Sequence, residues 1–560
     1  MKMKNILIPS IIALLLSGCD LSILPRPSGD THNSSEPTTY DGDIDETFID
    51  YNLNKDRLGD NQLPIGDYGD YVEYSDATMD GKPTAELAEL SKSVKGTAND
   101  IFQTNYQQGL LNLFSYEKHI KFVIDISSTE IAKLERDYYK RNRESYRICN
   151  LDIYMDNLHF HYEQVGIRQK GNTSRDFIRE NDKINLNHFK LSLEETFIDE
   201  YRDENNKWYS NAAKTYREDR KFFGANKFNI RWNRNEDKTY IREMYASEMY
   251  RDNGVLAARM NPIQVGLSLD GGETQNMGVY MLTEQINKGF LKRNLVSSAR
   301  GGDLYKLTWG RSSSGASFRT DTISHIGIAS QYWSDSIYVQ NSKTYEIKTN
   351  EETSNYSVLK NFITDLNNTA GKDSLTFMQN RSILDSFYSF AACSFILGDP
   401  DDLRGNSNNA YVYFTGDTNK IVFIPTDMDR VLGATGNTNG DNPTGNHGAR
   451  IGLYDSRTGY GNANQIFHKT IISSNALDSR EVYRSKISEA INKGWLNMDK
   501  FNSYYNVVKG LHINDIHLGN QINGNELEFS LNESEDLGGS YNLSVSKYLS
   551  EKLNVINSSI

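Results

Sequence analysis

Residues Ala391–Gly433 read AACSFILGDPDDLRGNSNNAYVYFTGDTNKIVFIPTDMDRVLG. The stretch begins with an apolar segment typical of a buried helix, which breaks at Gly398-Asp399-Pro400 because proline ends a helix sterically. Two short apolar runs, Ala410–Phe414 and Ile421–Pro425, flank a turn and predict a β-hairpin. The loop between helix and hairpin, together with the residues just after the hairpin, carries Asp399, Asp401, Asp402, Asn406, Asn408, Asn409, Asp427 and Asp429.

A helix, an acidic loop with asparagines, a hairpin and a further aspartate pair form the layout that phosphoryl-transfer sites use. In such sites one aspartate lies beside the attacking hydroxyl, and an asparagine and a later aspartate hold Mg²⁺ against the phosphates. The alternative is a plain solvated loop, since Asp and Asn also favour turns. A calcium loop that starts at Asp399 and Asp401 is disfavoured, because the next alternate position, Leu403, offers no oxygen ligand.

A second informative stretch, Gly166–Arg175, is a strand end followed by a basic turn, and Phe189–Leu193 returns as a strand. The glycine of the turn allows close approach to a phosphate, and Arg168 and Lys170 supply positive charge. Lys190 lies mid-strand between apolar neighbours, where its ammonium group needs a carboxylate or a phosphate. The spacing matches neither a Walker loop nor GxGxxG. A hairpin with a basic, solvated tip is the alternative interpretation.

The remaining patterns predict an α+β fold with a strand-rich N-terminal half and a helix-rich C-terminal half. Further strands are expected at Ile120–Ile126, Arg147–Tyr154, Lys227–Arg231, Ile263–Leu269, Gly278–Leu282 and Gly302–Leu307, and helices at Thr84–Lys92, Thr239–Arg251, Tyr356–Leu366, Ile383–Leu397, Glu481–Lys493 and Ser544–Val555. The basic elements belong to the first half and the acidic ones to the second. A cleft between the halves would supply Lys or Arg for phosphates and Asp for a metal.

The first residues match a bacterial lipoprotein signal. Lys2 and Lys4 form a basic region, Ile6–Leu16 is apolar but too short to span a bilayer, and Leu16-Ser17-Gly18-Cys19 places small residues before a cysteine. We therefore expect residues 1–18 to be a signal peptide and Cys19 to be lipidated. An ordinary signal peptide with a chance cysteine is the alternative. The expected location is the cell envelope, with the protein anchored to the membrane.

Residues 19–60 are expected to be a disordered acidic tether, since residues 20–60 hold ten acidic and three basic residues with few apolar ones. The folded part is then residues 61–560. The chain has a net charge of −13 and a pI of about 5.4, which argues against general nucleic-acid binding. With Cys19 lipidated, Cys149 and Cys393 remain and make no disulfide framework. Cys393 is expected to be a buried small hydrophobe.

A series of short motifs runs through about residues 160–435. Arg168–Arg175 is similar to R-x-R-G-N-S-S, and the strand Phe189–Leu191 follows it. Asp237–Gly254 is similar to a charged D-x-x-x-x-R-E helix, and Gly278–Glu284 is similar to G-x-Y-x-L-x-E. Leu304–Lys306 and Asp401–Tyr413 come next, and Ile424–Asp429 is similar to I-P-W-D-x-D. Together, and in this order, the motifs resemble the CotH family of spore-coat-type kinases. The resemblance implies a divergent, two-lobed protein-kinase-like fold with insertions and an N-terminal extension.

The resemblance also implies transfer of the ATP γ-phosphate to a serine of a protein substrate, with Mg²⁺ or Mn²⁺. Carried over by position, Asp402 is the catalytic-loop aspartate, with Asp401 its nearest competitor. Asn409, Asp427 and Asp429 are the metal residues. The residues expected to bind phosphate or to form an ion pair at the nucleotide are Arg168, Lys170, Lys190, Glu284 and Lys306, with the lysine partner of Glu284 left open.

Three departures from the family pattern affect these assignments. Lys170 stands where the family has arginine, which loses bidentate geometry, and Thr426 replaces a tryptophan. The gap from Asp402 to Asn409 is longer than usual, which leaves the identity of the asparagine open. The alternatives to a surface kinase are a catalytically silent scaffold with the same fold and a calcium-dependent binding lipoprotein. All the carboxylates that the chemistry needs are present, which favours the enzyme.

Overall fold

The computed structural model describes residues 73–74, 78–79, 82–83 and 85–559, apart from the gaps 140–144, 157, 172–174, 176–177, 181–182, 196–219, 236, 310–314, 335–336, 342, 435–447, 457–463, 517–527 and 532–542. The signal peptide, Cys19 and the tether lie outside these residues. Among the described helices, none is both long and apolar enough to cross a bilayer.

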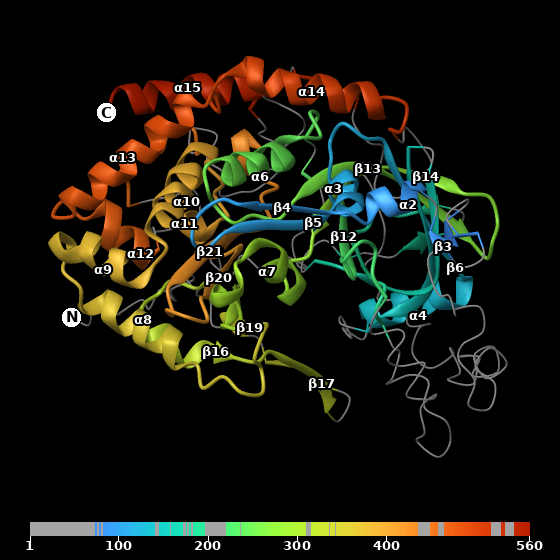
Figure 1. Ribbon diagram of the computed structural model, residues 1–560, viewed down its shortest axis with the longest axis horizontal. Helices are drawn as coiled ribbons and strands as arrows, with labels where there is room; N and C mark the ends of the chain where they lie inside the picture. Colours follow the sequence, from blue (N-terminus) through green and yellow to red (C-terminus); the bar gives the residue numbers. More distant parts are fainter. Residues whose placement is uncertain are drawn as a thin grey trace, which may run out of the picture.

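The N-terminal part is built around a closed β-barrel (right side of Figure 1). Within the described residues seven strands follow one another in the order β8, β11, β12, β14, β13, β6 and β7, and β7 pairs back onto β8. All neighbours are antiparallel except β6 and β13. The strands are β6 (Ile120–Ile126), β7 (Arg147–Met155), β8 (Leu158–Gln169), β11 (Phe189–Ser192), β12 (Lys227–Trp232), β13 (Met260–Leu269) and β14 (Gln275–Glu284).

Alternation of apolar and polar residues explains why these strands close around a core. Side chains of successive residues point to opposite faces of a strand, and one face of each strand carries the buried cluster that includes Phe122, Leu151, Ile167, Leu191 and Phe228. The other face of β8, β11 and β12 is polar and lies outside the barrel. A strand β1 (Glu73–Tyr74) pairs with β8, and α4 (Ser128–Tyr139) packs against β7.

The C-terminal part is a second sheet covered by helices. Its strand order is β16 (Ile326–Gly327), β19 (Tyr345–Ile347), β15 (Leu304–Leu307), β20 (Ala410–Phe414) and β21 (Ile421–Pro425). The helices are α6 (Arg242–Asp252), α8 (Ser357–Asn368), α9 (Ser374–Arg381), α10 (Leu384–Leu397), α11 (Leu403–Asn406), α12 (Gln465–Phe467), α13 (Leu477–Asn492), α14 (Met498–His512) and α15 (Val545–Asn557).

One face of this sheet and the barrel-side helix α7 (Lys288–Asn294) share a smaller apolar cluster with Tyr411, Tyr413 and Ile424. The opposite face packs on α8 and α10 in the largest core. The central apolar helix α10 runs through that core, with twelve of its fourteen residues buried. Cys393 and Cys149 are both buried and free, which confirms the expectation for Cys393.

Several shorter elements complete the fold. An N-terminal extension contributes α2 (Ala85–Leu90), the hairpin of β4 (Ser93–Thr97) and β5 (Gln103–Gln107), and α3 (Gln108–Leu113). Helix α14 extends along the top of the molecule towards the barrel (Figure 1) and contacts β13. The remaining two-stranded pairs are β2 (Thr78–Met79) with β3 (Lys82–Pro83), β9 (Arg179–Glu180) with β10 (Lys183–Ile184), and β17 (Ser330–Ser334) with β18 (Ile337–Asn341).

The expected α+β class, with strands first and helices later, is confirmed. The sequence patterns did not predict that the N-terminal sheet closes into a barrel. They also missed α4, α7 and α14. A protein-kinase-like, two-lobed arrangement stays a prediction drawn from the resemblance.

Candidate functional site

A basic face on the outside of the barrel holds several of the expected phosphate-binding residues. Arg168 of β8 lies directly opposite Lys190 of β11, which lies opposite Asn229 of β12. Cross-strand partners share a face, so these three side chains form one row. Arg231, two residues beyond Asn229, extends the same face, and the backbone N–H of Lys170 donates to the carbonyl of His188 at 2.8 Å. The sheet therefore gathers positive charge on one surface.

The basic face is joined to the second sheet by a glutamine. The Asn229 amide donates to Gln285 Oε1 at 3.0 Å, and the Tyr411 hydroxyl is hydrogen-bonded to Gln285. Lys306 lies opposite Tyr411 and Glu346 in the second sheet. Its neighbours Tyr305 and Leu307 point into the core instead. Lys306 thus extends from the sheet face that lies towards the barrel, as strand alternation requires.

The acidic loop begins where α10 ends. Gly398 adopts a left-handed conformation with φ of 63°. A Cβ at this position would lie 2.1 Å from the Tyr548 hydroxyl and 2.9 Å from the backbone of Gly448. Only glycine fits this combination of backbone and space. The chain therefore turns sharply and brings Asp399, Asp401 and Asp402 out of the helix in quick succession.

Asp402 begins the short helix α11 as its N-terminal cap. Its Oδ1 accepts from the Gly405 backbone N–H at 2.6 Å, and its Oδ2 accepts from the Ser394 hydroxyl. Burial raises the pKa of Asp402 to about 6, although these hydrogen bonds and Arg404 counteract the rise. Each carboxylate oxygen keeps a second lone pair for a further proton or hydroxyl. A fixed carboxylate with a pKa near 6 has the properties of a general base.

Asp401 and Asn409 lie against each other in the same loop. The Asn409 amide nitrogen donates to the Asp401 carbonyl at 3.0 Å and to its carboxylate at 3.2 Å, and the Asn406 amide donates to that carboxylate at 2.6 Å. Asn409 holds its left-handed backbone (φ 51°) at the start of β20. Because the nitrogen of its amide faces Asp401, the oxygen remains for another ligand. Burial raises the pKa of Asp401, which the Asn406 hydrogen bond partly offsets.

Asp399 has an unusual environment. Its side chain is 6% exposed, Oδ1 accepts from the Asp401 N–H at 2.8 Å, and the buried Oδ2 has no hydrogen-bond partner within the described residues. Burial, followed by the charges of Asp402 and Asp401, raises its pKa well above the usual range. A buried carboxylate oxygen without a partner is costly. The loop therefore holds a buried carboxyl oxygen that no hydrogen bond within the described residues satisfies.

Asp427 and Asp429 follow the hairpin and meet the barrel through Arg231. Asp427 has a left-handed backbone (φ 58°), and its Oδ1 contacts the Arg231 guanidinium. Asp429 lies 3.9 Å from the same guanidinium, and the other side of Arg231 is paired with Glu243 of α6. The charge of Asp429 also raises the pKa values of Asp399 and Asp401. The two acidic segments and the basic face thus form one site around Arg231.

Lys170 and His188 lie beside this arginine. Burial, followed by the charges of Arg231 and Lys306, lowers the pKa of Lys170 to about 7. Burial and Arg231 hold the pKa of His188 well below its usual value, and its Nδ1 accepts from the Trp232 N–H at 3.1 Å. A pocket next to Arg231 is lined by residues that include His188, Trp232, Arg234, Glu243 and Asp429. Crowded positive charge of this kind favours a bound anion.

The model of the CotH kinase protein family matches residues 167–514. The chain belongs to the CotH kinase family. The match begins on β8 beside Arg168 and ends at α14, so it covers the basic face, the acidic loop and the aspartates after the hairpin. No curated protein matches the chain.

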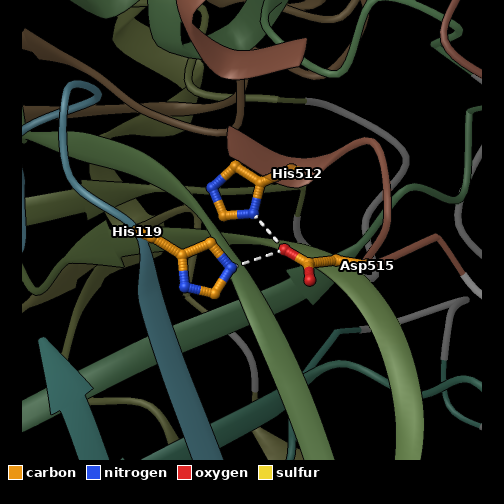
Figure 2. Close-up of side chains that lie close together, drawn as sticks. All are labelled: His119, His512 and Asp515. Carbon is orange, nitrogen blue, oxygen red and sulfur yellow. Dashed lines mark hydrogen bonds and ion pairs between the residues drawn. The ribbon is translucent and has the colours of Figure 1, made fainter. Parts of the chain in front are cut away.

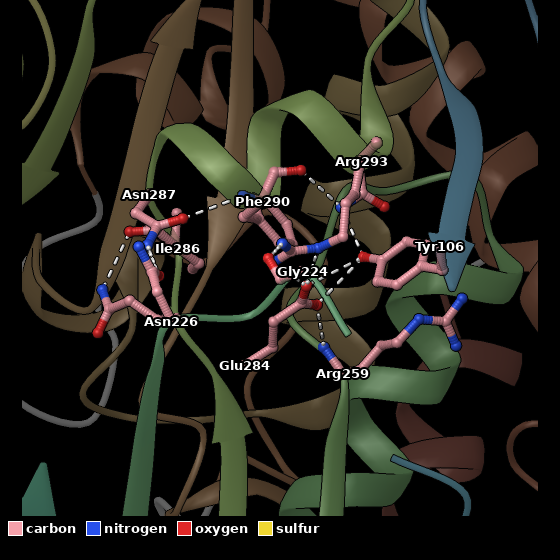
Figure 3. A network of polar contacts seen from close by, with 11 residues as sticks. Tyr106, Gly224, Asn226, Arg259, Glu284, Ile286, Asn287, Phe290 and Arg293 are labelled. Atoms are coloured by element: carbon pink, nitrogen blue, oxygen red, sulfur yellow. Dashed lines mark hydrogen bonds and ion pairs between the residues drawn. The ribbon is translucent and has the colours of Figure 1, made fainter. Parts of the chain in front are cut away.

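Glu284 lies apart from the basic face, contrary to the expectation that it pairs with a lysine there. It is opposite Phe228 in the sheet, whereas Asn229 is opposite Thr283, so alternation turns Glu284 to the other face. Figure 3 shows its partners: Arg293 donates to it at 2.8 Å and 3.0 Å, and the Tyr106 hydroxyl lies 3.2 Å away. Glu284 instead links β14 to α7 and to the N-terminal extension.

Sequence reasoning missed Arg231, Glu243 and His188. A signal for Arg231 was present, because KFNIRW alternates between apolar Phe228 and Ile230 and polar Asn229 and Arg231. Glu243 was part of the recognised charged helix, but no role followed from its position. The hydroxyl residues of the basic turn, Thr173 and Ser174, lie outside the described residues.

Substituting Arg231 with methionine is expected to lower the free energy of unfolding by about 3–5 kcal/mol, because it leaves Glu243 buried without its cation. Both side chains of this pair are almost fully buried, at 7% and 9% exposure. Urea denaturation measures the change. Arg381→Ala is the control, since its ion pair with Asp365 is exposed and is expected to contribute less than about 1 kcal/mol. Equal losses in the two variants would contradict the prediction.

Proposed function

We propose that this CotH-family chain is a protein kinase of the cell envelope that transfers the γ-phosphate of ATP to a serine or threonine of a surface or secreted protein. The observation that carries the proposal is that Asp427 and Asp429 meet the basic barrel face at Arg231, on which the charge of Asp399 from the acidic loop also acts. Phosphoryl transfer needs cations for the phosphates, oxygen ligands for a metal and a carboxylate near the acceptor.

The residues present fit a divalent cation. Asp427 and Asp429 are partly exposed, at 44% and 36%, and Asn409 keeps its amide oxygen available. The buried Oδ2 of Asp399, which has no hydrogen-bond partner within the described residues, adds a further oxygen. Mg²⁺ and Mn²⁺ prefer such oxygen ligands. When bound, the ion would neutralise negative charge on the phosphates. In the ligand-free protein, Arg231 provides the positive charge next to Asp427 and Asp429.

The other side chains have separate tasks in this proposal. Arg168, Lys170, Lys190 and Lys306 hold the phosphates, with Arg231 and His188 beside them. Asp402, held by the Gly405 N–H and Ser394, orients the acceptor hydroxyl and takes its proton. Asp401 and Asn409 keep the loop in shape through their mutual hydrogen bonds.

The test is label transfer by the purified full-length chain. The protein is incubated with γ-labelled ATP and Mg²⁺ or Mn²⁺, and protein-bound label is located by mass spectrometry. We expect label on serine or threonine, and none when the metal is chelated. Binding of Mg-ATP without any transfer to the chain or to envelope proteins would favour the catalytically silent scaffold.

Membrane attachment is proposed to depend on Cys19. Cys19→Ser is expected to move the protein from the membrane fraction to the soluble fraction, because lipidation would be its anchor. Fractionation with a high-salt wash measures this, and Cys149→Ser, at a buried position in the barrel, is the control that should stay with the membrane. Retention of the Cys19→Ser protein in the washed membranes would show that another feature holds it.

A further inference from the structure

His119 meets two residues from the distant end of α14, His512 and Asp515 (Figure 2). His119 Nε2 and His512 Nδ1 each lie 2.7 Å from the same carboxylate oxygen, Oδ2 of Asp515. One potential ligand atom from each residue lies within 4.8 Å of the other two. The two imidazole rings stack with their centroids 5.0 Å apart. Both rings therefore direct a nitrogen at the same carboxylate oxygen.

The surrounding structure holds this arrangement in place. His512 is in the last turn of α14 and Asp515 follows three residues later, with its backbone N–H donating to the His512 carbonyl at 3.0 Å. The Asn276 amide of β14 donates to the Asp515 carbonyl at 2.8 Å, and its own oxygen accepts from the Gly278 N–H. His119 directly precedes β6. The donors come from elements whose backbones are already fixed, as a metal site requires.

The donor chemistry suits a transition metal better than Mg²⁺ or Ca²⁺. Two imidazoles and one carboxylate are a ligand set that zinc sites use, with a fourth position for water. Tetrahedral ligand atoms around zinc lie about 3.3 Å apart, so the 2.7 Å contacts need to open only slightly. His512 and Asp515 are 1% and 11% exposed, whereas the His119 side chain is 38% exposed. Solvent and ions therefore have a route to the buried donors through His119.

We propose that His119, His512 and Asp515 form a binding site for a divalent transition metal ion, Zn²⁺ in particular, which fastens the end of α14 to the barrel. The site shares no residue with the kinase site. Asp515 directly follows residues 167–514, which the family match covers, and His119 lies before that range. The metal would tie the strand that precedes the matched domain to the turn that ends it. Metal binding is therefore expected to raise the Tm of the whole domain.

The experiment uses the full-length chain carrying Asp427→Ala, so that the proposed Mg²⁺ ligands do not compete for the probe. The metal-stripped protein is titrated with Co²⁺, whose visible absorption is intense when nitrogen ligands hold it in tetrahedral geometry. We expect saturation at one equivalent and displacement by Zn²⁺. Excess Zn²⁺ should raise the Tm by about 2–4 °C, because the ion binds the folded state.

Two variants separate metal binding from a purely structural role. His119→Ala changes a half-exposed residue and should weaken Co²⁺ binding more than about 100-fold, since loss of an outer-shell partner alone costs about 10–100-fold. Asp515→Asn keeps an oxygen that accepts both histidine N–H groups, so its Tm without metal should equal that of the parent. The Zn²⁺-dependent rise in its Tm should disappear. A rise that persists in both variants would overturn the proposal.

The chain offers a matched control in β7 and β8. Asp152 Oδ1 there accepts from His159 at 2.6 Å and from His161 at 2.8 Å, the same residue types in a different arrangement. His159→Ala should leave the Co²⁺ spectrum unchanged. A spectrum that is lost in His159→Ala and kept in His119→Ala would place the metal at Asp152, His159 and His161 and would overturn the proposal. Absence of any saturable Co²⁺ spectrum in the parent would show a hydrogen-bonded cluster only. Neither result depends on whether the chain transfers phosphate.

Discussion

Replacing Asp427 with alanine is expected to remove metal-dependent nucleotide binding and phosphoryl transfer together, with the transfer rate lowered at least about 10³-fold. Asp427 is the carboxylate that follows the hairpin, and its oxygen already contacts the Arg231 cation in the ligand-free protein. A divalent ion would take over that electrostatic role. Without the carboxylate, the ion loses a hard oxygen ligand and the phosphates lose their neutralising partner.

Thermal-shift titration with Mg-ATP and label transfer measure the two losses side by side. Asp427 is 44% exposed and Arg231 keeps its buried partner Glu243, so the Tm without ligand should stay close to that of the parent. Asp417→Ala is the matched control, because this aspartate lies in the exposed turn of the same hairpin. It should leave binding and transfer unchanged. An Asp427→Ala protein that binds Mg-ATP with the parent Kd would remove Asp427 from the proposed metal site.

The parts of the fold that follow local patterns were predictable from the sequence. The hairpin Ala410–Phe414 with Ile421–Pro425 has the predicted bounds, because two apolar runs around a polar turn leave little alternative. Helix α10 ends at Leu397 as expected, since a glycine and a proline follow at once. The acidic loop and the aspartates after the hairpin were also recognisable. Their positions in the chain are set by the helix before them and by the hairpin between them, which the sequence predicts.

The features that the sequence did not predict depend on contacts between residues far apart in the chain. Closure of the barrel needs β7 to pair with both β6 and β8, which no local pattern encodes. The sheet face on which Glu284 lies is set by its pairing with Phe228 on β12. The ion pair of Arg231 with Asp427 joins residues 196 positions apart. The contact of His119 with Asp515 spans 396 residues. A single sequence shows which residue types are available but not which of them meet.

Asp399 and Asp402 are predicted to respond differently to substitution, although both are buried aspartates of one loop. Asp399→Asn is expected to stabilise the ligand-free protein near neutral pH. Burial and two neighbouring carboxylates raise the folded-state pKa of Asp399 well above 3.8, so ionisation costs folding free energy as pH rises above that value. The amide removes this cost. Its Tm should exceed that of the parent at pH 7, and the difference should shrink towards pH 4.

Asp402→Asn is expected to lower the transfer rate about 10²–10⁴-fold while Mg-ATP binding is kept, because a general base contributes on that scale. Asparagine preserves the cap on Gly405, since its oxygen accepts the same N–H, and Ser394 can donate or accept at the other atom. The substitution therefore removes the proton acceptor and keeps the loop. In the parent, kcat/KM should fall as pH drops below about 6, the pKa of Asp402.

The two variants together decide which carboxylate takes the proton. Loss of transfer in Asp402→Asn, with Mg-ATP affinity unchanged, assigns the base to Asp402. Transfer at the parent rate in Asp402→Asn, with loss in Asp399→Asn, moves the role to Asp399, whose Oδ2 is the partnerless oxygen of the described loop. Asp401→Asn completes the set, because Asn406 and Asn409 already bind its carboxylate. Full activity in all three variants would contradict a kinase site in this loop.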